Sequence, residues 1–202
     1  MSAAGPPQET RPLGGTARSD ARGDTTSAGQ PPGTHSPGAT ARSGNLGEDP
    51  SLAQGAWFDD VRIGDRFSAR VTITDAHLLI GAGLIGDFNP HHVDDEYART
   101  TRFGSRILHG VLTSALMGAP VGMHFHGTAV AYLEHAARFV APARPGDTLT
   151  TTWTVAACDP KPAKRSGVVV LTGVCHKQGG VLVAEASAKM LVNMRPALAA
   201  AT

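Results

Sequence analysis

The sequence predicts a single α+β domain, and three observations support this prediction. Apolar and polar residues alternate over 67–73, an uncharged apolar segment spans 107–123, and four further strand-like segments follow between residues 128 and 192. Alternation with a period of two is typical of a half-buried strand, whereas a helix that is apolar on all sides is typically buried. One strand, then helices, then a succession of strands is the order of an α+β fold.

The folded domain is predicted to span 56–195, between a disordered tail at 1–55 and a short C-terminal tail at 196–202. The first 50 residues include nine glycines and seven prolines, and no Phe, Trp or Tyr precedes Trp57. This composition exceeds the roughly 25–30% Pro plus Gly that indicates a low-complexity segment. It offers too little apolar surface to offset the entropy of ordering. The remaining part, about 140 residues, suits one hydrophobic core.

The charge and the cysteine content exclude several classes of protein. The net charge of +1 does not favour binding to nucleic acid or to an anionic membrane. No segment approaches the roughly 20 apolar residues of a membrane span, and the N-terminal tail lacks the apolar core of a signal peptide. Cys158 and Cys175 are too few for a disulfide framework and are interpreted as free thiols. We therefore expect a cytoplasmic protein with neither a nucleic-acid nor a membrane partner.

The elements before the apolar segment are predicted from residue alternation and from residues that favour the start of a helix. The alternating residues of 67–73 form the first strand, and Thr74 or Asp75 can cap a short helix that follows it. Three consecutive acids at 94–96 lie where the helix dipole favours negative charge, which predicts the start of a second short helix. A loop at 86–92 is expected between the two helices.

The long apolar helix and the later strands are predicted from hydrophobic runs and turn residues. The helix is expected to be buried on all sides and to end near Gly122, because Gly118 and Pro120 disfavour its continuation. The later strands are expected at 128–134, 148–157, 168–176 and 181–192. Turns are expected at 145–147 and 178–180, and a polar hairpin loop at 161–167.

The most informative motif is Gly-Asp-Phe-Asn-Pro-His-His at 86–92, which is followed by Leu-His-Gly at 108–110. It places Asp87 and His92 five positions apart, with an Asn-Pro turn between them. Gly110 lies where the apolar helix should begin, so its N–H can face a ligand. An acid/base pair with a backbone donor is what the addition of water to a polarised double bond requires.

This motif resembles that of the MaoC-like, or (R)-specific enoyl-CoA hydratase, family of hot-dog-fold proteins. The family pattern is Gly-Asp-x-Asn-Pro-x-His followed by His-Gly at the central helix. The matching residues are Gly86, Asp87, Asn89, Pro90, His92, His109 and Gly110. The resemblance, which extends over about residues 60–193, implies an antiparallel sheet wrapped around one long apolar helix. It also implies a homodimer or a higher homo-oligomer.

The resemblance further implies an enzyme that hydrates trans-2-enoyl-CoA to (R)-3-hydroxyacyl-CoA, or runs the reverse dehydration, in fatty acid metabolism. Asp87 and His92 would be catalytic, one activating the water and the other protonating the α-carbon. The Gly110 N–H would bind the thioester oxygen as the enolate forms. No cofactor is expected, because coenzyme A is part of the substrate.

Three residues are candidates for substrate binding, each with a structural alternative. Asn89 either makes the turn or also holds the loop and the catalytic water. His109 either contacts the substrate or packs inside the domain. Arg138 can meet the phosphates of coenzyme A, as can the hairpin cations Lys161, Lys164 and Arg165, although a solvated hairpin tip explains the latter equally well.

Several other polar residues are interpreted as non-catalytic. The motif spacing favours His92 over its neighbour His91 as the chemical residue. No Cys, Asp or Glu near the His-x-His at 124–126 completes a metal site, so no metal is expected. Adjacent strand residues face opposite sides, which argues against cooperation between Glu134 and His135.

Two competing functions remain, namely an acyl-CoA thioesterase and a non-catalytic acyl-CoA-binding hot-dog protein. Hot-dog thioesterases lack the Asp-x-Asn-Pro-x-His loop, and a binder would be expected to replace Asp87 or His92. We also expect the apolar neighbours Leu84, Ile85 and Phe88 to shield the Asp87 carboxylate from water, which would favour proton exchange near neutrality.

Overall fold

The computed structural model describes residues 54–196, so nearly all of the two predicted tails lies outside the described residues. Five strands form one antiparallel sheet in the order β1-β3-β4-β5-β2. Their bounds are β1 Arg66–Thr72, β2 Ala129–Phe139, β3 Thr148–Lys161, β4 Ser166–Lys177 and β5 Val181–Asn193. Each predicted strand is present, and β2 and β3 are longer than expected.

Four α-helices connect β1 to β2, namely α1 Asp75–Ile85, α2 Pro90–Val93, α3 Asp95–Thr100 and α4 Gly110–His124. Thr74 is the N-cap of α1, and Asp94 is the N-cap of α3, where its carboxylate accepts a hydrogen bond from the Tyr97 N–H at 3.0 Å. Both caps lie where the sequence predicts helix starts. No helix within residues 54–196 is long and apolar enough to cross a membrane.

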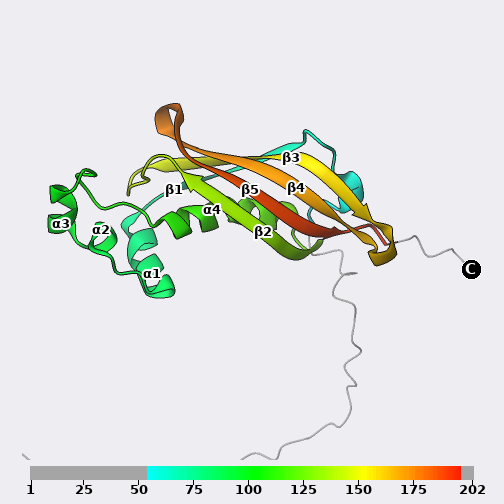
Figure 1. Ribbon diagram of the computed structural model, residues 1–202, viewed down its shortest axis with the longest axis horizontal. Helices are drawn as coiled ribbons and strands as arrows, with labels where there is room; N and C mark the ends of the chain where they lie inside the picture. Colours follow the sequence, from blue (N-terminus) through cyan, green and yellow to red (C-terminus); the bar gives the residue numbers. More distant parts are fainter. Residues whose placement is uncertain (1–53, 197–202) are drawn as a thin grey trace, which may run out of the picture. The chain divides into compact units, whose positions relative to one another are not determined.

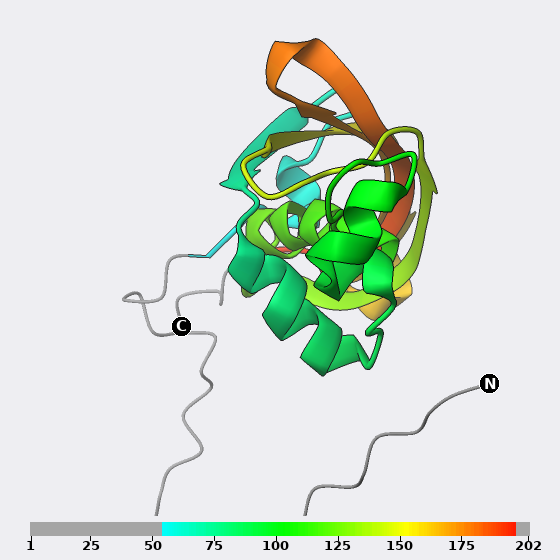
Figure 2. The same cartoon turned by 90° about the vertical axis from the view of Figure 1, so that its left-hand side faces the viewer.

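The strand order explains why α4 lies against the sheet. β1 and β2 occupy opposite edges, so the segment between them must pass across one face. The sheet curves around α4, with α1 and α3 beyond one end of it (Figures 1 and 2). This arrangement confirms the predicted hot-dog fold.

The contact between α4 and the sheet centres on Trp153. Its side chain is completely buried, and its Nε1–H donates to the carbonyl oxygen of Met117 at 2.8 Å. The cross-strand partner of Trp153 is Gly173, and a Cβ at that glycine would lie only 2.7 Å from the indole ring. The glycine therefore leaves the space that the indole needs to reach the helix backbone.

The prediction that α4 is buried on all sides is wrong for this chain. Met117 is fully buried against the sheet, whereas Met123 is 68% exposed and Val111 also faces outward. The sheet covers only one side of the helix. The helix also continues past Gly122 to His124 with Pro120 inside it, although a proline there has no N–H to donate to the preceding turn.

Candidate active site

The end of α1 determines where the motif begins. Its C-cap is Gly86, which has a φ of +73° and donates its N–H to the carbonyl of Ala82 at 2.8 Å. In this left-handed conformation a residue with a Cβ would be strained. The glycine therefore reverses the chain and places Asp87 at the start of the loop.

The loop is stabilised by two successive side-chain-to-backbone hydrogen bonds. The Asp87 Oδ1 accepts from the Asn89 N–H at 3.1 Å, and the Asn89 Oδ1 accepts from the His91 N–H at 3.2 Å. Asn89 is thus the N-cap of α2, with Pro90 at its first position. The motif ends in a helical turn and not in an open loop, because Asn-Pro is preorganised to start a helix. The structure shows the turn-forming role of Asn89, while its role toward water stays a prediction.

His92 projects from α2 toward Asp87. Its Nδ1 lies 2.7 Å from the carbonyl oxygen of Ile107, which can only accept, so Nδ1 carries the hydrogen in the neutral ring. The lone pair is then on Nε2, which lies 3.8 Å from Oδ2 of Asp87. This distance is too long for a direct hydrogen bond and suits a bridging water.

The surroundings of His92 favour its neutral form. Burial lowers the pKa of His92, and the neighbouring His109 and His91 act in the same direction. The hydrogen bond to Ile107 and the Asp87 carboxylate oppose this shift without overcoming it. The His92 side chain is 12% exposed and that of Asp87 is 47% exposed.

The predicted apolar shield around Asp87 is not present within residues 54–196, where the Asp87 side chain is 47% exposed. Leu84, Ile85 and Phe88 are themselves exposed. Leu84 and Ile85 are the last two residues of α1, and Phe88 comes two residues after its C-cap Gly86.

His109 and Gly110 complete the group at the start of α4. The His109 ring is fully buried, and its Nε2 lies 2.9 Å from the carbonyl oxygen of Asp87. The ring also stacks on that of His92, with the two centroids 3.7 Å apart. Gly110 is the exposed first residue of the helix, where N–H groups lack intrahelical partners. A Cβ on Gly110 would lie 3.2 Å from the Phe139 ring.

Two hollows lie next to this group. A pocket of about 250 Å³ is lined by Gly110, Phe139 and Arg102, among others. An almost wholly apolar groove of about 370 Å³ runs between α1 and α4. A larger groove of about 500 Å³ between β1 and α4 has none of the predicted site residues in its described lining.

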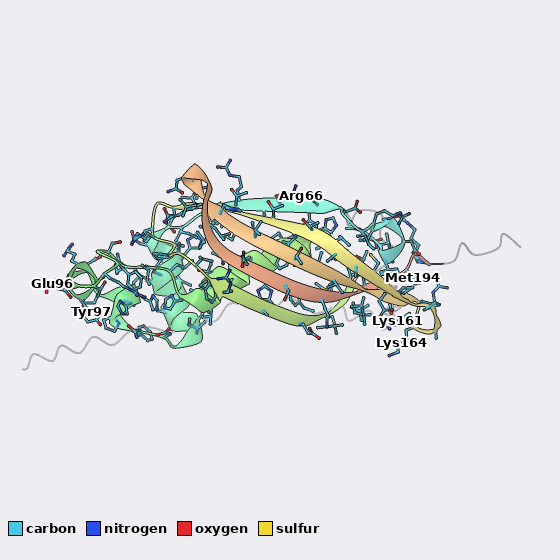
Figure 3. The ribbon with its side chains drawn as sticks, turned by 45° about the horizontal axis from the view of Figure 1, so that its top comes forward. Arg66, Glu96, Tyr97, Lys161, Lys164 and Met194 are labelled. Carbon is cyan, nitrogen blue, oxygen red and sulfur yellow. The ribbon has the colours of Figure 1, made fainter. Side chains whose placement is uncertain are left out.

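The predicted phosphate-binding cations lie in different parts of the domain. Arg138 pairs with Glu185 at 2.6 Å on an exposed part of the sheet. Lys161 and Lys164 lie at the opposite end of the domain from Glu96 and Tyr97 of α3 (Figure 3). The contact of Arg138 with coenzyme A stays a prediction.

The remaining polar candidates have partners that agree with a structural role. His124 stacks on Phe67 with centroids 4.0 Å apart. Glu134 pairs with Lys189 at 2.9 Å, whereas His135 contacts the Tyr132 hydroxyl at 2.7 Å. Glu134 and His135 thus have different partners.

Asp87, His92 and His109 have ligand-type atoms within 4.8 Å of one another, the spacing of a possible metal site. However, Nε2 of His109 and Nδ1 of His92 already face carbonyl oxygens. Only one ring nitrogen of each histidine remains for another partner. This arrangement is common to catalytic and metal-binding histidines, so the expectation of no metal stays a prediction.

Two contributors to the site were not predicted from the sequence. One is the carbonyl of Ile107, which orients His92 and carries no residue-specific signal. The other is Arg106, which binds Asp75 at 2.7 Å and Asp95 at 2.8 Å and so joins α1 and α3 to the segment before α4. Its partners lie 31 and 11 residues away, beyond any local pattern.

Comparison with known proteins agrees with this geometry. Residues 61–176 match the MaoC like domain family. The chain is 34% identical over 139 residues to an (R)-specific enoyl-CoA hydratase of Rhodospirillum rubrum, covering 69% of this chain and 93% of that protein. It is 33% identical over 91 residues to a 3-hydroxybutyryl-CoA dehydratase of Methylorubrum extorquens, covering 45% and 58%.

A solved structure shows the same fold. The unliganded R-hydratase PhaJ1 of Pseudomonas aeruginosa aligns with a TM-score of 0.64 and 28% identity, covering 74% of this chain and 95% of that one. The matched domain includes Asp87, His92 and Gly110. The chain therefore belongs to the MaoC-like dehydratase family.

Proposed function

We propose that this enzyme adds water to a trans-2-enoyl-CoA thioester to give the (R)-3-hydroxyacyl-CoA, and catalyses the reverse dehydration. The observation that supports this most directly is the 3.8 Å separation of Asp87 Oδ2 and His92 Nε2, close to the start of α4. The (R)-specific hydratase and the dehydratase among its relatives support the same reaction class. Fatty acid metabolism and a cytoplasmic location stay predictions.

The acid/base pair is suited to holding one water molecule. The Asp87 carboxylate and the Nε2 lone pair of His92 are both acceptors, so a water between them donates one hydrogen to each. Its oxygen lone pair then points away from both groups, toward the β-carbon of the substrate. As the C–O bond forms, one group takes a proton from the water. This proton passes to the other group, which delivers it to the α-carbon, so both groups return to their starting protonation states.

The amide of Gly110 is suited to the negative charge that develops during this step. Attack at the β-carbon moves the double-bond electrons toward the thioester oxygen, which becomes an enolate oxygen. The exposed N–H at the start of α4 can donate to this oxygen, and the positive end of the helix dipole adds to the stabilisation. The thioester already polarises the double bond, so we propose that no metal or redox cofactor is needed.

The apolar groove between α1 and α4 is the proposed place for part of the acyl chain. It has a volume of about 370 Å³, and Leu108 and Leu112, on either side of His109 and Gly110, contribute to its wall. Ile80 and Leu84 form the facing wall from α1. An acyl chain that extends from a thioester bound at Gly110 can therefore bury its carbons in this groove without crossing the sheet.

A spectrophotometric assay with crotonyl-CoA and a panel of acyl-CoA lengths, including one dicarboxylic member, tests this function. Hydration removes the enoyl absorbance without releasing a thiol, and chiral analysis should give the (R) product. Thiol release would indicate a thioesterase, and binding without turnover across the panel would indicate a non-catalytic binder. Activity should survive chelation, and its loss with recovery on adding a divalent ion would contradict the metal-free mechanism.

A further inference from the structure

We infer that His109 is a positioning residue for this reaction. It holds the Asp87 loop against the start of α4, and its ring shields one face of the His92 imidazole from water. This role rests on the proposed function, and it adds a second histidine that acts on the acid/base pair without touching the substrate. The hydrogen bond of His109, its stacking on His92 and its complete burial support the inference.

The hydrogen bond connects the two halves of the site. Nε2 of His109 lies 2.9 Å from the backbone oxygen of Asp87, which belongs to the loop between α1 and α2. The backbone of His109 is the N-cap of α4, so the next residue is Gly110. One side chain therefore sets the distance between the carboxylate that faces the water and the amide that faces the thioester oxygen. A displacement of about 1 Å between such groups can cost roughly a hundredfold in rate.

The protonation of His109 follows from its partners. The carbonyl of Asp87 can only accept, so Nε2 of His109 carries a hydrogen. Its Nδ1 is buried and has no hydrogen-bond partner within residues 54–196. Nε2 is therefore the ring nitrogen through which His109 holds the loop.

The buried ring of His109, stacked on His92, excludes water from one face of the His92 imidazole. The centroids lie 3.7 Å apart and the planes are inclined by 28°. The other titratable groups that face His92 are the Asp87 carboxylate, from the loop, and His91, on its own helix. Because burial of His92 is the main cause of its lowered pKa, loss of the stacked ring should raise that pKa.

Two variants separate the hydrogen bond from the ring. His109→Gln keeps an N–H donor but removes the ring, so kcat should fall by less than about tenfold while the acid limb of kcat/KM moves to higher pH. His109→Phe keeps a ring but removes the donor, so kcat should fall by about ten- to a hundredfold with little movement of the acid limb. His91→Gln is the matched control, because His91 packs edge-on against Tyr97 and Phe103.

An NMR titration of the His92 ring in each folded variant tests the inference without turnover. The apparent pKa of His92 should rise in His109→Gln and change little in His109→Phe and His91→Gln. An unchanged titration in both His109 variants, with losses only in melting temperature, would show a purely structural residue and overturn the inference. A wild-type chain that shows the expected titration but hydrates no substrate would count against the proposed function and leave the positioning role standing.

Discussion

Oδ2 of Asp87 and Nε2 of His92 lie 3.8 Å apart, and both residues are held in place by hydrogen bonds to other parts of the chain. The other ring nitrogen of His92 is held by the carbonyl of Ile107, and the backbone of Asp87 by His109. The gap between the two acceptors is therefore built into the fold. A water placed to one side of the line between the two atoms could donate a hydrogen bond to each of them.

Substitution of either member of this pair should abolish most of the activity. Asp87→Asn and His92→Ala are each expected to lower kcat by about 10²–10⁴-fold, because each removes a group that exchanges a proton in the transition state. Circular dichroism and melting temperature should stay close to the wild type. His91→Ala is the control, and a larger loss of kcat in that variant would show that the spacing of the motif has been misassigned.

The pH dependence of the hydration reaction should reflect the lowered pKa of His92. The ring must be neutral for Nε2 to accept a hydrogen from water, and protonation below its pKa removes that lone pair. Because burial lowers this pKa below 6.5, the neutral form persists to lower pH than in an exposed histidine. The acid limb of kcat/KM is thus expected below pH 6.5. A limb that begins clearly above this value would contradict the assignment.

The N–H of Gly110 can be tested by a pair of substitutions that differ in this donor. Gly110→Pro removes the N–H, yet proline is favoured at the first position of a helix. His109, with φ −56° and ψ 138°, already has the extended conformation that a residue before proline prefers. Gly110→Ala keeps the N–H and adds a Cβ near the Phe139 ring, which is half exposed and can shift. The proline variant should lose about 10²–10³-fold more kcat than the alanine variant. Equal losses would mean that this amide is not the oxyanion donor.

The boundary of the folded domain can be located by two truncations. Removal of residues 1–53 should leave the melting temperature and kcat almost unchanged, as expected from their composition. Removal of residues 1–56 also deletes Gly55 and Ala56, whose N–H groups donate to the carbonyls of His126 at 2.7 Å and His124 at 2.9 Å. Only the longer truncation should lower the melting temperature. A clear loss with the shorter one would show that the tail docks on the domain.

Self-association is expected at least to the level of a dimer. The edge strand β2 and the residue after it expose apolar side chains, among them Val130, Leu133, Phe139 and Val140. An edge strand with such side chains is typically covered in the functional assembly. Light scattering at assay concentration should give twice the chain mass or more. An active monomer would refute this expectation.

Much of the fold could be predicted because local chemistry determines it. Alternation in β1, the caps at Thr74 and Asp94, and the uncharged run of α4 each depend on neighbours within a few residues. The failure at α4 has a different origin. Met123 is as apolar as Met117, but only the position of the sheet decides which of them is buried.

The site shows the same division. The residues of the motif predict that Asp87 and His92 flank a common turn, because Gly86, Asn89 and Pro90 impose the local backbone. That Ile107 orients the His92 ring and that Arg138 pairs with Glu185 follows only from the tertiary structure. Backbone torsions depend on adjacent residues, whereas burial and partner choice depend on segments that meet only when the sheet closes around α4.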